Sequence, residues 1–417
     1  MTLNVLYDHQ IFSYQKYGGI SRYFTEILHE IPNHGVNPIL TMYNNKNAHL
    51  LNYKWGREIK IENTNRVDDF FKKTNNFTND MVVKLNLRGK EYCDVFHPTY
   101  YNPYFLKHVG KKPYVITVHD MIHELFPEQN VEGDNTKEWK RQVLSGATRL
   151  IAVSENMKED IQKFYDIDPN IIDVVYHGCS LEDVREIYSV DNSDMVGDIM
   201  YVDNDEVCNG HYIEFEKDTN DWYAHWLNKD LFRKRIVLFV GSRGGYKNFS
   251  EFIKAMETII KKYDDIKIIC FGGGKFTDIE KYTIHNYNLT KYVVWVSGDD
   301  ILLKFIYDHT QLFVFPSLYE GFGIPILEAF YSGCTLLLSN RSCFPEIAGD
   351  AAIYFEPDET GEAKDLIEKI DGYLSELVSS GTDGIFKYKW NGCERIKNFS
   401  WKKSAEQTVN VYKKCLE

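Results

Sequence analysis

The sequence predicts two successive α/β domains, each built on a parallel sheet. In both halves, short apolar runs that read as strands alternate with segments long enough for crossover helices. The chain has 417 residues, too many for one ordinary core and suited to two domains of roughly 200 residues. A hydrophobic fraction of 43% with 26% charged residues is typical of a globular protein.

The first half opens with a strand at residues 3–9, a glycine turn at Tyr17-Gly18-Gly19 and a run with helical spacing, ISRYFTEILHEI. Gly18 and Gly19 suit a close backbone approach to a phosphate, although turns also need glycines. Four more runs are predicted strands: 94–96, 114–119, 149–153 and 172–176.

The second half repeats the pattern with nearly continuous apolar runs, which suit a sheet covered on both faces. These runs are 236–241, 266–274, 293–298, 312–317 and 335–340. Between the halves, residues 186–234 carry 12 acids against 4 bases, and we interpret them as an insertion or linker. The expected organisation is an N-terminal domain at 1–180, the acidic segment at 181–234, a C-terminal domain at 235–398 and a final helix at 399–417.

The overall charge of −13 argues against a nucleic-acid-binding surface, which depends on clustered Lys and Arg. No apolar run approaches the roughly 20 residues that span a bilayer, and the first residues do not resemble a secretory signal. We therefore expect a cytosolic protein. The eight cysteines show no CxxC spacing, so we expect reduced and mostly buried thiols.

The segment 315–329, FPSLYEGFGIPILEA, carries the chemistry. A strand ends at Pro316, a glycine-containing loop follows, and Pro325 suits the first position of a helix. Free amides and partial positive charge at that helix start favour a diphosphate. Glu320 in the loop and Glu328 one turn into the helix are carboxylates whose natural partners are sugar and ribose hydroxyls.

This E-x7-E motif resembles that of the retaining glycosyltransferases of family four, which have the GT-B fold. The similarity covers nearly the whole chain apart from roughly 40–90 and 186–234. The other matching segments, in order, are AVSENMKEDI (152–161), VVYHGCS (174–180), VLFVGSRGGYKNF (237–249), SNRSCFPEIAGDAAIYFEP (339–357) and FSWKKSAEQTVNVYKKCL (399–416).

The resemblance implies two Rossmann-like domains facing each other across a cleft. The first would lie on the acceptor side and the second would bind a sugar nucleotide, while the C-terminal helix returns to the N-terminal domain. The implied reaction moves a sugar from a nucleoside-diphosphate sugar to an acceptor hydroxyl with retention of anomeric configuration. A growing surface glycan or a lipid-linked saccharide is the expected acceptor.

Roles for the acids and the helix start follow from the same resemblance. Glu328 would bind the nucleotide ribose and Glu320 the hydroxyls of the donor sugar. Backbone amides would contact the sugar and phosphates; they belong to Phe322, Gly323 and Ile324.

Cations for the diphosphate are expected at Lys247 and Arg243, beside Ser242 in a glycine-rich turn after a strand. The family spaces this Arg and Lys five or six apart, whereas the interval here is four, so a loop-stabilising role for Arg243 stays open. His119, at the end of a strand, matches a histidine that the family places near the reacting face of the donor sugar. A lone histidine at a strand end is more often structural.

No metal and no cofactor besides the donor are expected. Asp203-Asn204-Asp205 superficially resembles a D-x-D metal motif, but it lies in an acid-rich segment and reads as a solvated charge run. No His/Cys cluster offers a metal site either. The alternatives are a noncatalytic sugar-nucleotide-binding protein, or an epimerase or phosphorylase on the same fold. A phosphorylase would need a longer chain and a pyridoxal-phosphate lysine environment.

Two further expectations concern the first half. Residues 46–112 hold 13 Lys and Arg against 7 acids, and within them 68–85 could form an amphipathic helix, with Phe70, Phe71 and Phe77 near lysines. Peripheral contact with a membrane and ordinary core packing explain these aromatics about equally well. Residues considered for the acceptor side are His97, Tyr101 and His123.

Overall fold

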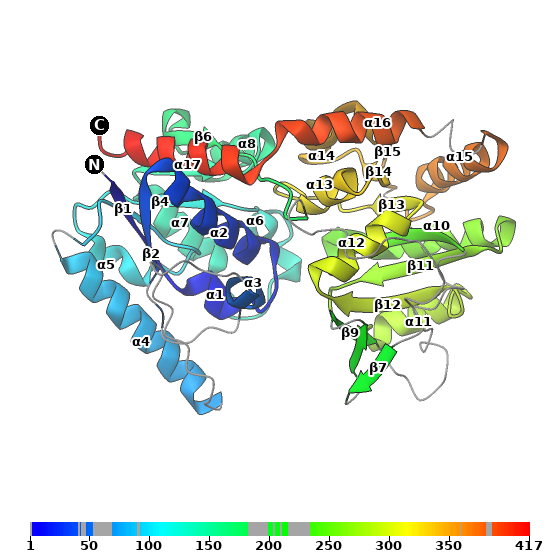
Figure 1. The fold of residues 1–417 in the computed structure, drawn as a ribbon, viewed down its shortest axis with the longest axis horizontal. Helices are drawn as coiled ribbons and strands as arrows, with labels where there is room; N and C mark the ends of the chain where they lie inside the picture. The colour runs from blue at the N-terminus through cyan, green and yellow to red at the C-terminus, as the bar shows by residue number, and fades with distance from the viewer. Residues whose placement is uncertain are drawn as a thin grey trace. The chain divides into compact units, whose positions relative to one another are not determined.

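The computed structural model describes residues 2–40, 42, 47–52, 69–89, 92–181, 199–202, 205–208, 211–215, 234–358, 360–380 and 386–417. These residues form two compact units (Figure 1). Unit 1 comprises Met1–Gly178 and Phe399–Glu417, and unit 2 comprises Cys179–Asn398. Each unit is an α/β structure and is described by itself below.

Unit 1 contains two parallel three-stranded sheets, with the orders β2-β1-β3 and β4-β5-β6. A parallel bridge between Phe96 and Tyr114 joins β3 to the start of β4. The strands are β1 (Leu3–Tyr7), β2 (Val36–Leu40), β3 (Val95–His97), β4 (Val115–Val118), β5 (Arg149–Ala152) and β6 (Ile172–Val174). All five strands predicted in this half are confirmed.

Strand β2 was not predicted from the sequence. Its residues VNPIL contain Pro38, which lacks the amide hydrogen that a central strand needs. The structure resolves the conflict because β2 lies at the edge of the sheet and pairs only with β1 among the described strands.

Helices connect the strands of unit 1. They are α1 (Gln10–Tyr14), α2 (Gly19–Glu30), α3 (Ala48–Asn52), α4 (Asp69–Arg88), α5 (Leu106–Val109), α6 (Ile122–Leu125), α7 (Thr136–Ser145), α8 (Glu155–Tyr165) and α17 (Trp401–Lys414). Short 3₁₀ turns are η1 (Ile31–His34), η2 (Pro103–Phe105), η3 (Pro127–Gln129) and η4 (Pro169–Ile171). The predicted helix at 68–85 is confirmed as α4.

The C-terminal helix α17 belongs to unit 1, as predicted, and contacts α2, η1 and β5. Trp401, Val409 and Tyr412 of this helix are buried in the core that β1, β2 and α2 also build. Gly178 packs directly on the start of the helix, since a Cβ there would lie 2.2 Å from the amide nitrogen of Trp401. The ring of His177 stacks on Trp401 with centroids 5.5 Å apart.

A buried polar network ties α17 to the strands. His97 Nδ1 lies 2.7 Å from Tyr412 Oη, and His97 Nε2 lies 2.9 Å from Thr117 Oγ1. Tyr7 Oη and Tyr412 Oη are 2.6 Å apart. Burial lowers the pKa of His97 to about 3, and it lowers the pKa of His177 to the same value. Both imidazoles are therefore neutral in the folded protein.

Acidification is expected to destabilise unit 1. His97 and His177 have a pKa of about 3 when folded and near 6.5 when unfolded, so the unfolded chain binds more protons between these values. The stabilisation is complete above pH 6.5 and falls as the pH falls towards 3. By pH 5 the loss is about 2 kcal/mol for each histidine.

Urea unfolding across this pH range measures the loss. In the variant His177→Gln the free energy of unfolding should depend less steeply on pH. Equal stability at pH 5 and at neutral pH would contradict the expectation.

Unit 2 is built on one sheet with the strand order β15-β14-β13-β10-β11-β12-β9-β8-β7. The first six are parallel, and β9, β8 and β7 continue the sheet in antiparallel fashion from β12. The strands are β7 (Ile199–Val202), β8 (Asp205–Cys208), β9 (His211–Phe215), β10 (Arg235–Val240), β11 (Ile266–Phe271), β12 (Val293–Gly298), β13 (Leu312–Phe315), β14 (Thr335–Ser339) and β15 (Ile353–Phe355).

The acidic segment is thus more than a linker, because its described residues extend the sheet by three strands. Asp203 and Asn204 of the D-x-D-like triplet lie outside the described residues. All five strands predicted in the second half are confirmed as β10 to β14.

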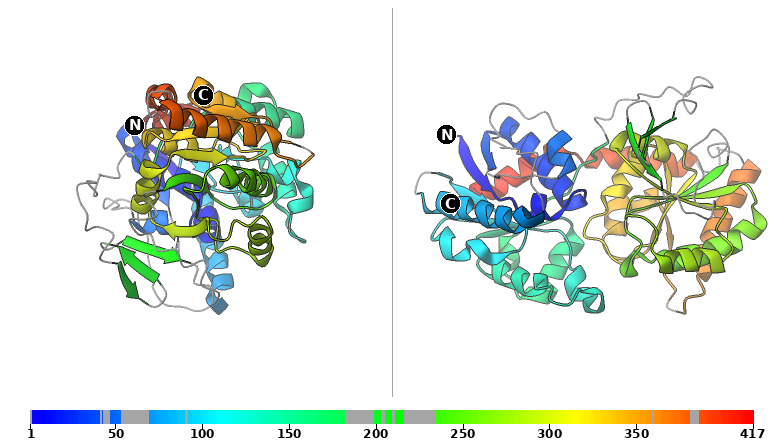
Figure 2. Two further views of the ribbon diagram at one scale, coloured as in Figure 1. Left: turned by 90° about the vertical axis from the view of Figure 1, so that its right-hand side faces the viewer. Right: turned by 90° about the horizontal axis from the view of Figure 1, so that it is seen from below.

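Helices lie on both faces of this sheet (Figure 2), as its apolar strands predict. They are α10 (Phe249–Lys262), α11 (Asp278–Asn286), α12 (Asp300–His309), α13 (Ile324–Tyr331), α14 (Phe344–Ala348), α15 (Lys364–Ser380) and α16 (Phe386–Arg395), with the 3₁₀ turns η5 (Gly245–Lys247), η6 (Gly349–Ala351) and η7 (Ile396–Asn398).

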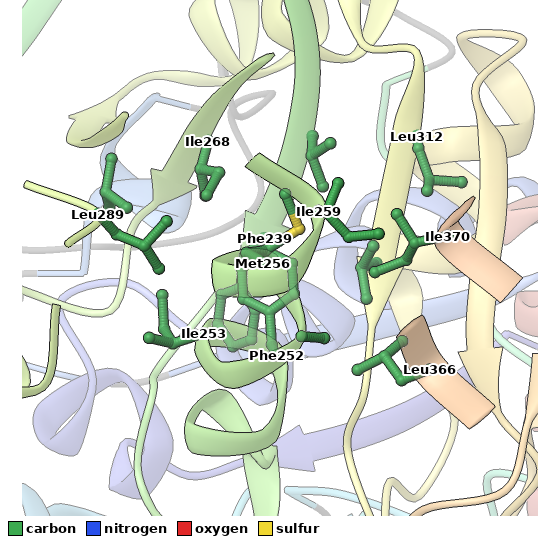
Figure 3. Close-up of a cluster of buried hydrophobic side chains, with 14 of the residues drawn as sticks. Phe239, Phe252, Ile253, Met256, Ile259, Ile268, Leu289, Leu312, Leu366 and Ile370 are labelled. Carbon is green, nitrogen blue, oxygen red and sulfur yellow. The ribbon is translucent and has the colours of Figure 1, made fainter. Parts of the chain in front are cut away.

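Figure 3 shows the core between the sheet and helices α10 and α15. Phe252 and Met256 of α10 meet Phe239 and Ile268 of the strands, and Leu366 of α15 closes the cluster. Each such side chain contributes about 1.5–3 kcal/mol through burial. The core holds the strand ends in place, and the loops that follow these ends carry the candidate site.

Five of the described cysteines are buried, as the sequence predicts: Cys93, Cys179, Cys270, Cys334 and Cys343. Among the helices within the described ranges, none combines the length and the apolar character needed to cross a bilayer.

Candidate functional site

The candidate site of unit 2 lies at the carboxyl ends of three neighbouring strands. β10 pairs with β11 on one side and with β13 on the other, so the loops that follow these strands start side by side. The loops comprise residues 241–248, 272–277 and 316–323. They contain every residue that the sequence assigned to donor binding in this half except Ile324 and Glu328, which lie on α13.

The loop after β13 turns into helix α13 at Gly323, which has φ 85°. A side chain there is disfavoured, because a Cβ would lie 3.1 Å from Ile326 Cδ1 and 3.3 Å from the Phe344 ring. The helix begins at Ile324, so Pro325 occupies its second position and not the predicted first. Phe322, Gly323 and Ile324 therefore lie at the helix N-terminus, where backbone amides and the positive end of the helix dipole favour an anion.

Hydrogen bonds from other segments hold this loop. Ser342 Oγ donates to the carbonyl of Glu320 at 2.6 Å, and the amide of Leu318 donates to the carbonyl of Tyr246 at 2.7 Å. Ser342 and Tyr246 were missed in the sequence as contributors to the site. Both lie in segments that match the family pattern, which was the available signal.

The structure brings Glu320 and Lys247 together. Lys247 Nζ lies 2.5 Å from Glu320 Oε1, and both side chains are largely buried. The ammonium group also lies 5.6 Å from the centroid of the Phe315 ring and 5.2 Å from that of Tyr246. An acid and a base thus meet beside the start of α13.

Glu328 lies one turn further along α13 and is buried. Its Oε2 accepts a hydrogen bond of 3.3 Å from the hydroxyl of Tyr307 on α12. Burial, followed by the negative charge of Glu328, raises the pKa of Tyr307 well above its usual value. Tyr307 is therefore a constant hydrogen-bond donor to Glu328, a contact that the sequence did not predict.

Arg243 is committed to the neighbouring loop. Its guanidinium donates to the carbonyls of Gly272 and Gly274 at 3.0 and 2.6 Å, and to Glu280 Oε1 at 3.0 Å, and its charged group lies over the Phe276 ring. This arrangement is the loop-stabilising role that the sequence left open. Ser242 beside it is exposed.

The two glycine loops touch through their backbones. Gly273 has φ 70°, and a Cβ on it would lie 2.2 Å from the carbonyl oxygen of Gly241. Gly272 and Gly274 also have positive φ, so this loop cannot satisfy its carbonyls through regular structure. Arg243 supplies the missing donors.

In unit 1, Gly18 precedes helix α2 and Gly19 is its first residue. A Cβ on Gly18 would lie 2.3 Å from Gln15 Oε1, which itself accepts a hydrogen bond of 3.2 Å from the amide of Ser21. The Gln15 side chain thus packs closely against Gly18. Phosphate binding by Gly18 and Gly19 stays a prediction.

His119 directly follows β4 and is 9% exposed. Its Nε2 is buried without a hydrogen-bond partner in the part of the chain that the structure describes. Burial, followed by the charges of His177, His97 and Lys140, holds the pKa of His119 well below its usual value. The imidazole is therefore neutral, and it packs edge-on against the Tyr23 ring at 5.0 Å.

Residues 17–183 match the family model for Glycosyltransferase Family 4, and residues 228–377 match the one for Glycosyl transferases group 1. The chain belongs to the group 1, family-four glycosyltransferases.

Relatives of this glycosyltransferase span most of its length. An uncharacterized glycosyltransferase of Methanocaldococcus jannaschii is 24% identical over 81% of this chain and 80% of its own. The O-antigen chain mannosyltransferase RfbU of Salmonella typhimurium is 23% identical over 67% of each chain. The crystal structure of Anabaena HepE in complex with UDP superposes with a TM-score of 0.64 at 12% identity, covering 99% of this chain and 100% of that one. The fold is GT-B, as predicted.

No group of three or more His, Cys, Asp or Glu side chains within the described ranges of this glycosyltransferase is placed to hold a metal ion. Of the three residues that the sequence suggested for the acceptor side, two are buried in the structure, which makes that prediction wrong for them. His97 and Tyr101 are buried, because α17 and the segment after β4 cover them. His123 is partly exposed, with Nε2 at 3.2 Å from Asp134 Oδ2.

A fully buried lysine fixes the segment that follows His119. Lys140 Nζ donates to the carbonyl of Asp120 at 2.8 Å and to Glu124 Oε2 at 2.9 Å. The ammonium group lies 5.1 Å from the centroid of the Tyr101 ring, and the hydroxyl of Tyr101 accepts from the His119 amide at 3.1 Å. The other Glu124 oxygen accepts from Tyr165. Through Asp120 and Tyr101, Lys140 thus fixes the backbone at His119, a role that the sequence did not reveal.

Substituting Lys140 with methionine is expected to lower the free energy of unfolding by about 3–5 kcal/mol, because Glu124 would remain buried and unpaired. The double variant Lys140→Met/Glu124→Gln should recover part of this loss. Urea unfolding measures both, with Lys163→Met on the exposed face of α8 as the control. A loss no larger than that of the control would show that the ion pair is not required.

Proposed function

We propose that this glycosyltransferase moves a sugar from a nucleoside-diphosphate sugar to an acceptor hydroxyl, with retention of configuration and without a metal ion. The observation that carries the proposal is the contact between Lys247 and Glu320 beside the N-terminus of α13. A cation, the backbone amides at a helix start and two carboxylates match the parts of such a donor.

The diphosphate would bind the amides of Phe322, Gly323 and Ile324 together with Lys247. A helix N-terminus favours anions, and a cation about 4 Å from a phosphate is worth up to ~4 kcal/mol at a dielectric constant of 20, before desolvation. Because Arg243 is engaged with the glycine loop, Lys247 would be the main side-chain cation. The charge that develops on the leaving diphosphate would be stabilised by these same groups.

The two acids would bind hydroxyl groups of the donor. Glu320, held by Lys247 and by the backbone contacts of its loop, would accept from the donor sugar. Glu328, held by Tyr307, would accept from the ribose. Ser242, Gly18 and Gly19 would add contacts to the nucleotide. His119 would contribute a neutral imidazole to the transferred sugar.

The named relatives support this donor and acceptor chemistry. The Salmonella relative is a mannosyltransferase of O-antigen chains, and the Anabaena structure contains UDP. By analogy, the acceptor would be a growing surface glycan or a lipid-linked saccharide. For retention we favour a same-face route, in which the leaving phosphate oxygen takes the proton of the acceptor hydroxyl. Catalysis then consists of positioning and electrostatic stabilisation.

Removing the donor-site side chains is expected to abolish transfer without unfolding the protein. Glu320→Ala, Glu328→Ala and Lys247→Ala should each lower kcat/KM at least about 100-fold, the magnitude expected when a transition-state contact is lost. Transfer from radiolabelled UDP and GDP sugars, together with circular dichroism of each variant, measures this.

The matched control is the exposed ion pair between Glu257 and Lys261 on α10, which should tolerate alanine at either position. Rates near wild type in all three donor-site variants would end the proposal. The assay is repeated with EDTA, and loss of turnover on adding this chelator would contradict metal independence. An inverted anomeric configuration of the product, read by NMR, would contradict retention.

We further propose that helix α4 contacts an anionic membrane surface. Phe77, Met81 and Leu85 repeat every four residues on one face and are 67%, 53% and 58% exposed. The exposure of Phe77 favours a surface contact over core packing. The side chains of Phe70 and Phe71 lie outside the described residues.

Basic groups border this apolar stripe. Arg88 Nη2 lies 3.2 Å from His108 Nδ1. Burial, followed by the positive charges of Arg88, Lys84 and Lys107, lowers the pKa of His108. An apolar face beside clustered cations is the surface that binds anionic lipid headgroups.

Vesicle sedimentation tests this contact. The protein should sediment with phosphatidylglycerol vesicles at low salt and less with phosphatidylcholine. Both Phe77→Ser/Leu85→Ser and Lys84→Glu/Arg88→Glu should reduce sedimentation at least several-fold. Exposed apolar residues on α11 provide the control variant Ile279→Ser/Tyr282→Ser. No binding of the wild type at low salt would remove the proposal.

A further inference from the structure

Unit 1 has a topological switch point between β1 and β3. β1 pairs with β2 on one side and with β3 on the other, and the chain visits β2 before it returns to β3. In open α/β sheets, ligands bind beyond the carboxyl ends of the strands at such a point. The segments that leave these two ends are residues 8–18 after β1 and 98–105 after β3.

Two tyrosines meet there. Tyr14, the last residue of α1, is 48% exposed, and its ring lies 5.7 Å from that of Tyr100 in an edge-to-face arrangement. Tyr100 in turn contacts the buried Tyr101 with ring centroids 4.7 Å apart. Core packing accounts for Tyr101 but not for an exposed tyrosine at the end of α1.

A buried carboxylate locks the two segments together. Asp8 is fully buried and accepts hydrogen bonds of 2.8 and 2.7 Å from the amide and hydroxyl of Thr99, and of 2.7 Å from Gln10 Nε2. Tyr104 Oη also donates to it at 3.1 Å. Gln10 Oε1 accepts from the amide of Asn102 at 2.8 Å. Tyr14 and Tyr100 are thus presented by a rigid frame, which lowers the entropy lost when a ligand binds.

Charged groups of both signs lie around the pair. Burial raises the pKa of Tyr14. A hydrogen bond with Asn102 acts in the opposite direction, and the charges of Asp8 and Asp80 raise the pKa further, so the net shift is upward. Burial and then the charges of Asp120 and Asp134 raise the pKa of Tyr100. The nearby bases are each engaged by other groups. Lys140 pairs with Glu124 and Asp120, Lys84 lies over the Tyr104 ring and Lys16 over the Tyr17 ring, while His9 lies 3.0 Å from Asp80 and His123 3.2 Å from Asp134.

Because these bases are engaged, the pair offers a phosphate no cation from the described part of the chain, and it suits a neutral polyol. The rings offer negatively polarised faces to the C–H groups on one side of a pyranose, and the surrounding carboxylates and Asn102 offer partners for its hydroxyls. The combination distinguishes a neutral sugar ring from a nucleotide.

We propose that Tyr14 and Tyr100 form a subsite that stacks a neutral saccharide ring of the acceptor. The assignment rests on the proposed glycosyl transfer, but its binding step can be measured without turnover. It names residues other than His97 and Tyr101, which are buried.

The experiment uses the full-length chain and α-1,2-mannobiose as the neutral probe, with mannose 6-phosphate as the charged comparison. Saturation-transfer NMR should show contact with mannobiose, and titration should show weaker binding of the phosphorylated sugar. Tyr14→Ala should weaken mannobiose binding at least fivefold, and Tyr100→Ala similarly, whereas Tyr100→Phe should retain it because the ring remains. The control Tyr282→Ala removes an exposed tyrosine of unit 2 and should change nothing.

The subsite is overturned if wild-type protein does not contact mannobiose, if Tyr14→Ala binds it as well as wild type, or if mannose 6-phosphate binds equally tightly. UDP-induced thermal stabilisation, measured in the same variants, should stay unchanged. If transfer fails while mannobiose binding still depends on Tyr14, the proposed function is wrong and the subsite stands.

Discussion

The ion pair between Lys247 and Glu320 is the interaction on which the candidate donor site depends. It joins the loop after β10 to the loop after β13, two strands that lie side by side, and the contact of Leu318 with Tyr246 reinforces the junction. Neither charge is left unpaired in a largely buried position, where a lone charge would be costly. A bound diphosphate would share the ammonium group while sugar hydroxyls donated to the carboxylate. The same pair can therefore be satisfied with and without a donor.

Close backbone contacts set the rest of the geometry. Gly273 meets Gly241 at a distance that leaves no room for a Cβ, and Gly323, with φ 85°, is crowded by Ile326 and the Phe344 ring. A loop that contains three successive glycines with positive φ presents carbonyls that no regular structure satisfies, and the Arg243 guanidinium satisfies them. That commitment explains how a residue in a motif associated with phosphate binding can act on the protein itself. It also leaves more of the electrostatic task to Lys247 and to the helix N-terminus.

Prediction from the sequence succeeded where local pattern and tertiary structure agree. Apolar runs identified ten strands, and the motif order placed Glu320 and Lys247 in one site. Prediction failed where a partner lies far along the chain. β2 contains Pro38, which only its edge position makes tolerable, and strands β7 to β9 lie in an acid-rich segment that was interpreted as an insertion or linker. Tyr307, Ser342 and Lys140 act through contacts that no local pattern encodes. His97 was considered for the acceptor side, but α17 covers it.

Both candidate sites lie at the carboxyl ends of parallel strands, yet their charged groups are engaged differently. In unit 2, Lys247 pairs with Glu320 beside the start of α13, where the helix dipole favours an anion. In unit 1, Lys140 is held by Glu124 and Asp120, and Lys84 lies over the Tyr104 ring. The pair formed by Tyr14 and Tyr100 therefore offers ring faces and, among the described residues, no cation, which suits an uncharged sugar ring. Under the proposed function, the diphosphate would bind Lys247 and the start of α13, with backbone contacts from Gly18 and Gly19, while the tyrosine pair would bind the acceptor.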